Sequence, residues 1–155
     1  MLQQSNNTIT SIYPIGNQTE ELTALYCRLS QDDKQEGDSN SIINQKKILK
    51  RYAIEHGYQP YVFFVDDGFS GTNFNRPDFQ RMIKDIENGK INMVVTKDLS
   101  RLGRDYIETG EYIEKWFPGN NVRYVSVTDG IDTFEASNGN NDIAPFKSIL
   151  MIRIL

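Results

Sequence analysis

The stretch LTALYCRLS, residues 22–30, decides the fold, because an unbroken apolar run ends abruptly in an arginine and a serine. A short apolar run of this kind is typical of a strand in a parallel sheet. Side chains two apart on a strand share a face, so Arg28 and Ser30 are predicted to point the same way, with Leu29 turned into the core. Ligands of open α/β sheets bind outside the carboxyl ends of the strands. We therefore expect Ser30 to lie at a ligand site.

A second polar group follows another apolar run, at residues 91–95, where the sequence continues as KDLSRLGRD. Arg101 and Arg104 are three residues apart, so in a helix they would lie on one face, near enough to share one phosphate. Planar guanidinium groups bind phosphate through paired hydrogen bonds. Together with Ser30, this stretch indicates an activated serine that faces a phosphate.

Strands and helices alternate along the chain. Apolar runs predict further strands at residues 61–65, 91–95 and 122–127. Helices are predicted from a cap at Ser39 or Asn40 to a stop at Gly57, from Pro77 to Asn88-Gly89, and from Asp105 to Pro118-Gly119. This order predicts an α/β fold, with a mostly parallel sheet of four to five strands and helices on both faces.

The ends of the chain differ from this middle part. Residues 1–20 are polar and lack a sustained period, so we expect a flexible tail. Residues 21–137 form the predicted domain, and residues 138–155 are expected to hold a linker and the start of an apolar helix. Such a short apolar helix needs a partner, either a neighbouring subunit or its own continuation.

Composition excludes several classes of protein. The 155 residues carry a net charge of −4, which argues against nonspecific DNA binding as the main activity. No apolar stretch is long enough to span a membrane and the first 27 residues lack Lys and Arg, so a cytoplasmic protein without membrane contact is expected. The single cysteine, Cys27, excludes an internal disulfide, and we predict a buried thiol. Acidic residues show no convincing metal spacing, so neither a metal nor a cofactor is predicted.

Each feature has a plainer interpretation. A lone serine at a strand end is usually structural, and Arg76, which precedes Pro77, could be an ordinary loop charge. Arg28 on the same strand face and the pair formed by Arg101 and Arg104 favour the functional interpretation of Ser30. A phosphatase or a receiver-like domain would fit the α/β order but not four arginines with a serine.

Three motifs taken together, YCRLS, DDGFSG followed by NFNRP, and KDLSRLGRD, resemble the catalytic domain of serine recombinases, the resolvase/invertase superfamily. The sequence KDLSRLGR is most similar to the corresponding motif of the large, transposon-encoded members. The resemblance implies that Ser30 is a nucleophile that attacks a DNA phosphodiester, forms a 5′-phosphoserine and frees a 3′-hydroxyl. It also implies phosphate-contacting and supporting residues, namely Arg28, Arg76, Arg101, Arg104, Gln45 near the site, and Asp66, which would orient an arginine or assist proton transfer.

The resemblance further implies DNA at a recombination site as the partner, with self-association as a dimer and, in the full-length enzyme, as a tetramer. It identifies residues 138–155 with the start of a truncated oligomerisation helix. We expect the chain to be inactive without a DNA-binding region, and the alternative is a catalytically silent fragment that acts as a self-association module. Many small resolvases carry an aspartate where this chain has Ser100, which we expect to cap the following turn.

Overall fold

The computed structural model describes residues 21–135 of the chain. The expected tail at residues 1–20 and the expected linker and helix start at residues 138–155 lie outside the described residues, so both stay predictions.

A single five-stranded sheet forms the centre of the described region, with the strand order β3-β2-β4-β5-β6. Its four long strands run parallel: β2 (Leu22–Leu29), β3 (Tyr61–Asp67), β4 (Ile91–Thr96) and β5 (Arg123–Ser126). The short β6 (Ile131–Asp132) pairs antiparallel with β5. The predicted mostly parallel α/β sheet is confirmed.

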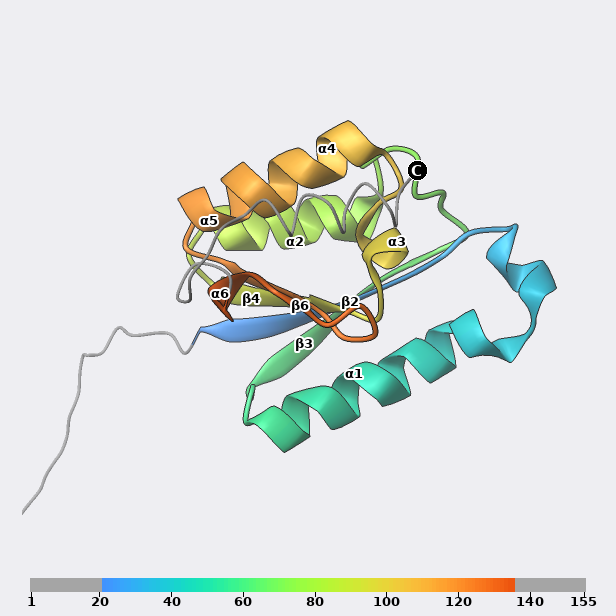
Figure 1. Cartoon of the computed structure of the whole chain (residues 1–155), viewed down its shortest axis with the longest axis horizontal. Coiled ribbons are helices and arrows are strands. Elements are labelled where there is room, and N and C mark those ends of the chain that lie inside the picture. Colours follow the sequence, from blue (N-terminus) through green and yellow to red (C-terminus); the bar gives the residue numbers. More distant parts are fainter. Residues whose placement is uncertain (1–20, 136–155) are drawn as a thin grey trace, which may run out of the picture.

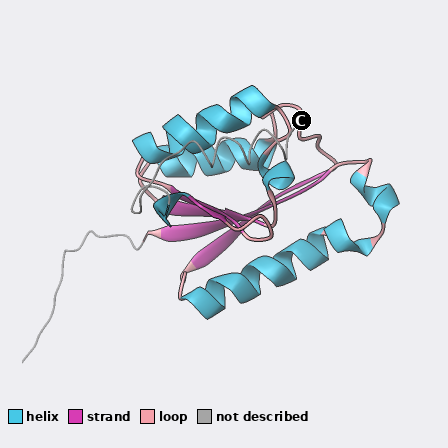
Figure 2. Cartoon of the chain, in the orientation of Figure 1, coloured by secondary structure: helices cyan, strands magenta, loops and turns pink. Residues whose placement is uncertain are grey.

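Helices cover both faces of this sheet (Figures 1 and 2). Helix α1 (Ile42–His56) lies on one face, and α2 (Pro77–Glu87) lies on the other beside a long helical stretch. That stretch consists of α4 (Tyr106–Glu111), a π-helix η4 (Tyr112–Trp116) and α5 (Phe117–Gly119). Shorter elements complete the described region: η2 (Asp33–Glu36), η3 (Asp38–Asn40), α3 (Leu99–Leu102) and α6 (Thr133–Glu135).

Strand β2 is central because both of its faces are apolar. Tyr26 packs in the cluster that includes Phe79 of α2, whereas Cys27 packs with Leu49 of α1. Alternation along the strand places Arg28 on the same side as Tyr26, and its side chain is fully buried. Leu29 is buried, as predicted, and Arg28 on the opposite face is buried as well, because the sheet is covered on both sides.

The helix boundaries follow local capping. Ser41 caps α1, because its Oγ accepts a hydrogen bond from the Asn44 amide at 3.1 Å. The predicted caps Ser39 and Asn40 lie instead in the preceding η3. Gly57 ends the helix with a φ of 74°, as predicted, because this left-handed conformation favours glycine.

The start of the α4 stretch was also predicted correctly. The Asp105 side chain accepts the Glu108 amide at 2.8 Å. The predicted end at Pro118-Gly119 agrees with the structure, because α5 ends at Gly119.

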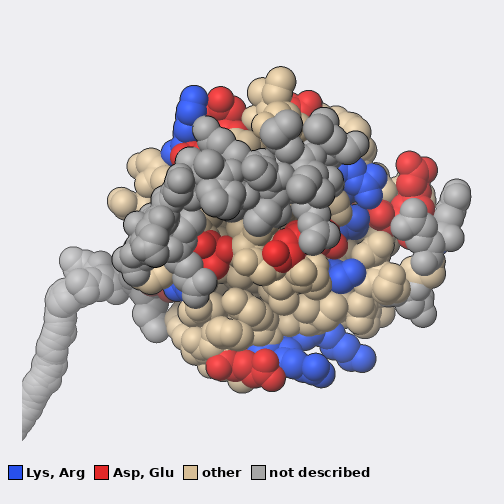
Figure 3. All heavy atoms as spheres, viewed as in Figure 1, with Lys and Arg blue, Asp and Glu red and all other residues tan. Residues whose placement is uncertain are grey.

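Basic and acidic side chains are interspersed on the face seen in Figure 3, and they form no continuous basic surface there. Within residues 21–135, no helix has the length and apolar character needed to cross a membrane.

Candidate active site

Ser30 lies directly after β2, at the carboxyl end of the parallel strands. Its hydroxyl donates to Asp33 Oδ2 at 2.7 Å, and its backbone amide donates to the same oxygen at 2.9 Å. In return the Asp33 amide donates to Ser30 Oγ at 3.2 Å. This reciprocal pattern is that of a capping box, and it fixes the serine hydroxyl against a buried carboxylate.

Arg101 approaches the same carboxylate from α3. Its Nη1 donates to Asp33 Oδ2 at 3.0 Å and its Nη2 donates to Asp33 Oδ1 at 3.2 Å, so the contact is bidentate. Nη1 also donates to the Arg28 carbonyl at 2.7 Å. The Ser100 hydroxyl accepts from Nη2 at 3.1 Å and from Nε at 3.4 Å. All five N–H groups of this guanidinium thus have an acceptor.

Asp98 caps α3, because its side chain accepts the Arg101 amide. The prediction that Ser100 caps this turn was wrong: Ser100 lies inside α3, and its hydroxyl donates to Asp98 Oδ1 at 2.6 Å. The carboxylate one position before the helix is the stronger cap here, since it can accept both hydrogen bonds.

Arg104 reaches the site by a different route from the predicted one. Helix α3 ends at Leu102, and Gly103 is extended, so the two arginines of the RLGR motif do not share a helix face. Even so, Arg104 Nη2 donates to Asp33 Oδ1 at 3.4 Å, and its side chain stays 40% exposed. The two guanidiniums therefore meet at one oxygen of Asp33.

Arg28 is buried beneath this group and directs its donors to backbone carbonyls. Nε donates to Arg101 O at 3.3 Å, Nη1 to Phe69 O at 3.0 Å and Nη2 to Ser100 O at 2.5 Å. These contacts join the end of β2 to α3 and to the loop after β3. Burial, followed by the charges of Arg101 and its other arginine neighbours, lowers the pKa of Arg28 to about 9.

Gly71, in the loop after β3, lies against two of these arginines. A Cβ added there would lie 2.7 Å from Arg28 Nη2 and 3.0 Å from Arg104 Cγ. Its own carbonyl accepts the Arg104 amide at 2.6 Å. The second glycine of the DDGFSG motif, Gly71, is thus required by the close approach of the two guanidiniums.

Arg76 belongs to a neighbouring buried group. Its Nη1 donates to the Tyr26 hydroxyl at 2.8 Å, and its Nη2 donates to Leu102 O at 2.6 Å. The guanidinium lies 4.7 Å from the ring centre of Phe74 and 4.9 Å from that of Phe79. These contacts hold Arg76 under the Arg101 segment, and none of them involves Ser30.

Asp66 and Gln45 hold the strand ends in place. Asp66 accepts the amides of Asp78 and Phe79, both at 2.9 Å, and so caps α2. It also accepts the Tyr26 hydroxyl at 2.7 Å and is thereby linked through that tyrosine to an arginine. Gln45 brackets the end of β2 from α1: its Oε1 accepts the Arg28 amide at 3.2 Å, and its Nε2 donates to the Arg28 carbonyl at 2.9 Å.

Asp33, in the stretch QDDKQEGD, is a site residue that the sequence analysis did not single out. Its spacing from Ser30, S-x-x-D, was the available signal, since a capping box has this form. Burial alone would raise the pKa of the Asp33 carboxyl, but the hydrogen bonds from Arg101 and Ser30 and the charge of Arg101 hold that pKa well below its usual range.

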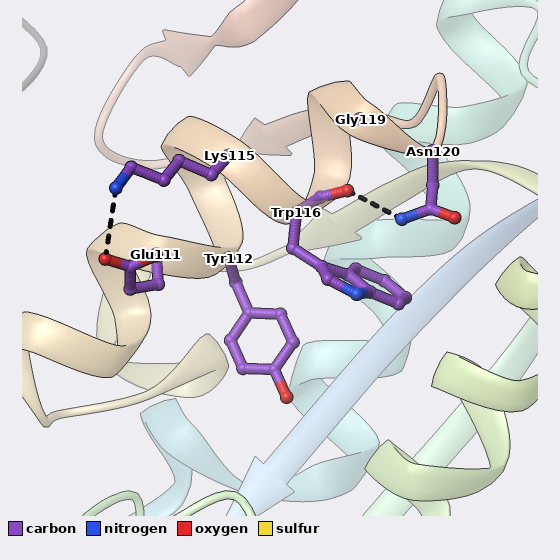
Figure 4. Close-up of a pocket in the computed structure, with 6 residues that line it drawn as sticks. All are labelled: Glu111, Tyr112, Lys115, Trp116, Gly119 and Asn120. Atoms are coloured by element: carbon purple, nitrogen blue, oxygen red, sulfur yellow. Dashed lines mark hydrogen bonds and ion pairs between the residues drawn. The ribbon is translucent and has the colours of Figure 1, made fainter.

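The residues in the described part of the chain contain no group of three or more His, Cys, Asp or Glu side chains that could hold a metal ion. A cavity of about 400 Å³ lies on the surface of the α4 stretch, and Figure 4 shows side chains that line it, among them Tyr112, Trp116 and the ion-paired Glu111 and Lys115. None of the predicted site residues lines it.

The serine that follows the central parallel strand lies beside buried Arg28 of that strand and buried Arg101 of α3, and Arg104 approaches from the segment after α3. This is the catalytic-domain architecture of a serine recombinase. Residues 23–148 match the family model "Resolvase, N terminal domain", and the chain belongs to this family. Family membership implies a DNA substrate and an oligomeric assembly.

Solved structures agree with this assignment. The N-terminal catalytic domain of TP901-1 integrase is 30% identical, with a TM-score of 0.67, over 86% of this chain and 93% of that chain. A resolvase family site-specific recombinase from Streptococcus pneumoniae is 29% identical, with a TM-score of 0.63, over 86% and 85%. The chain is also 35% identical over 71 residues to an uncharacterized immunity region protein 3 of Bacillus phage phi105, which covers 46% of this chain and 85% of that protein.

Proposed function

We propose that this chain is the catalytic domain of a site-specific DNA recombinase that cleaves and rejoins DNA through a 5′-phosphoserine intermediate. The observation that carries the proposal is the bridge from Ser30 Oγ through a single carboxylate, Asp33, to the guanidiniums of Arg101 and Arg104. A hydroxyl that shares one carboxylate with two forked cations is suited to attack on a phosphodiester.

In the proposed reaction, the Ser30 Oγ–P bond forms as the bond between phosphorus and the 3′ oxygen breaks. Ser30 loses its proton and the departing 3′ oxygen gains one, so the step is balanced without a co-reactant. The new phosphodiester conserves the energy of the broken one, and the reverse attack by the 3′-hydroxyl therefore rejoins DNA without ATP.

Positive charge from arginine supports this step. Phosphoryl transfer depends mainly on positioning and on neutralising charge at the equatorial oxygens. Arg101 and Arg104 are the groups next to Ser30, whereas Arg28 has three of its five N–H groups committed to carbonyls. We assign Arg28 two free donors for phosphate, and we assign Arg76, Asp66 and Gln45 to holding the strand ends and loops that carry the site.

The proposed assembly follows from the number of nucleophiles. Each chain carries one Ser30, and exchange between two duplexes cuts four strands, so four chains are needed at once. We therefore propose a dimer on each recombination site and a tetramer during exchange.

The test replaces Ser30 with alanine in the chain joined to a sequence-specific DNA-binding domain, which supplies the affinity that a net charge of −4 does not. With a nicked suicide substrate, the unchanged enzyme should accumulate a covalent protein–DNA adduct and Ser30→Ala should form none. Ser70→Ala is the matched control, because Ser70 is exposed and bonds only to nearby Thr72 in the contacts described. An adduct formed by Ser30→Ala would overturn the proposed function.

A further inference from the structure

Asp33 lies where the proposed function needs a phosphate. Its carboxylate contacts Ser30 Oγ at 2.7 Å, Arg101 at 3.0 and 3.2 Å, and Arg104 at 3.4 Å. It is buried, with only 1% of its surface exposed. A carboxylate and a phosphate present similar oxygen pairs to guanidinium forks, so the two anions compete for the same donors.

The donor count shows that the competition is direct. A guanidinium has five N–H groups, and in Arg101 all five have acceptors, two of which are the oxygens of Asp33. The other acceptors are a backbone carbonyl and the Ser100 hydroxyl, which belong to the framework of the site. Arg101 can therefore bind a phosphate through two N–H groups only after Asp33 releases them.

Charge leads to the same conclusion. The hydrogen bonds and charges around Asp33 keep it ionised at neutral pH. A phosphodiester is also an anion, and two anions that share one partly buried site repel each other strongly. The carboxylate of Asp33 and the phosphorus of the DNA therefore cannot both lie close to the same side of Ser30 Oγ.

The position of Asp33 in the fold permits the exchange. It is the first residue of η2, a four-residue 3₁₀-helix between β2 and α1 that is followed by Gly37, where φ is 90°. Arg101, by contrast, is held by α3 and by the Arg28 carbonyl. A shift confined to η2 could remove the carboxylate and leave the guanidiniums in place.

We propose that Asp33 is a positioning residue that occupies the scissile-phosphate site in the DNA-free protein and that the phosphate displaces it. In this state the carboxylate holds the Ser30 hydroxyl and keeps Arg101 and Arg104 together without a bound anion. The proposal rests on the proposed function, because it concerns access to the same arginines.

The experiment measures the affinity of the 155-residue chain for inorganic phosphate by calorimetry. Asp33→Ser vacates the site and retains a hydroxyl acceptor for the turn, and we expect it to bind phosphate roughly tenfold more tightly than the unchanged chain, because the competing internal anion is gone. Asp33→Asn, which keeps the size but removes the charge, should show a gain of the same sign. Asp32→Asn is the matched control: the neighbouring Asp32 is exposed, and removing its charge should change the affinity by less than about twofold.

A second measurement needs no variant. In ¹⁵N-labelled unchanged chain, saturating phosphate should shift the amide signals of Ser30 and Asp33 together, because the hydrogen bonds between these residues break. The proposal is overturned if both variants bind phosphate no more tightly than the unchanged chain, as expected of a merely structural carboxylate. It is equally overturned if phosphate saturates the site while the two amide signals stay in place. Either failure leaves the adduct test of Ser30 unaffected, so the two proposals fail separately.

Discussion

Arg28 and Arg101 each hydrogen-bond to the backbone carbonyl of the other: Arg28 Nε donates to Arg101 O at 3.3 Å, and Arg101 Nη1 donates to Arg28 O at 2.7 Å. Two residues 73 positions apart in the sequence are thereby locked together, although their charges repel. The exchange joins the end of the central strand to α3. It explains how a chain can keep like charges close together inside a protein, because each guanidinium lies against a carbonyl dipole.

Replacing either Arg101 or Arg104 with lysine should slow the reaction, but the two changes should affect the stability of the fold differently. Arg104→Lys should slow covalent adduct formation roughly a hundredfold, since a point charge cannot replace a fork, while the free energy of unfolding changes by no more than about 1 kcal/mol because the side chain is partly exposed. Arg101→Lys should slow the reaction as much and also destabilise the fold, because its buried bidentate contact is lost. Suicide-substrate kinetics and urea unfolding measure the two effects.

Arg81→Lys is the control for these variants, since Arg81 forms an exposed ion pair with Asp78. It should leave adduct formation unchanged. Near-normal rates for both Arg101→Lys and Arg104→Lys would contradict the proposed phosphate site.

Gly71→Ala should disturb the site through steric overlap alone. The added Cβ would meet Arg28 at 2.7 Å and Arg104 at 3.0 Å, so we expect about 1–3 kcal/mol of destabilisation and slower cleavage. Gly110→Ala is the matched control: a Cβ at that position in α4 meets nothing within 4 Å, and the change should stabilise the helix by about 1 kcal/mol. Equal effects of the two changes, measured by thermal unfolding, would show that the loop can adapt.

Asp33 should make the fold sensitive to acid. Its pKa in the folded protein is depressed, whereas an unfolded aspartate has a pKa of about 3.9. The stability that it contributes is therefore fully present above about pH 4 and is lost as the pH falls through the lower folded value. Urea unfolding between pH 2 and 7 should show this loss.

The same curve for Asp33→Asn should be flatter below pH 4. Asp78, whose pKa is also lowered, contributes in the same range and stays in both proteins, so the difference between the curves isolates Asp33. Parallel curves would contradict an ionised Asp33 in the folded protein.

Cys27 should be unreactive in the folded chain. Burial between β2 and α1 raises the pKa of its thiol to about 12, so almost no thiolate exists at pH 8. A disulfide reagent should modify the native chain only at the rate of unfolding and should react at once in denaturant. Rapid modification of the native chain would show that this face of the sheet opens.

Much of the fold could be predicted because local rules decide it. The strand at residues 22–29 has an apolar run that suits burial on both faces, and Asp105 and Gly57 have the residue types that begin and end helices. The pairing of Ile131 with Ser126 could not be predicted, because a two-residue strand has no period of its own. The π-helical turn that begins at Tyr112 likewise lacks a recognised sequence signal.

The residues of the site could be predicted better than the contacts between them. Ser30, Arg101 and Arg104 could be grouped from the ends of two strands, and the structure brings them together at Asp33. The extended Gly103 changes how Arg104 arrives, and a helical spacing rule cannot anticipate it. Asp33 was missed because its burial results from long-range contacts with residues about 70 positions away.

The central position of β2 in the sheet affects how readily different parts of the chain exchange their amide hydrogens with solvent. Its neighbours β3 and β4 bond to both of its edges, so its amides should exchange with solvent only when the whole domain unfolds. Ser30 follows that strand directly, but its amide donates to the Asp33 side chain and not to a neighbouring strand, and Asp33 is the first residue of the short 3₁₀-helix η2. We therefore expect amide protection to fall sharply between Leu29, the last residue of the paired strand, and Ser30, whose amide is free to exchange once Asp33 releases it.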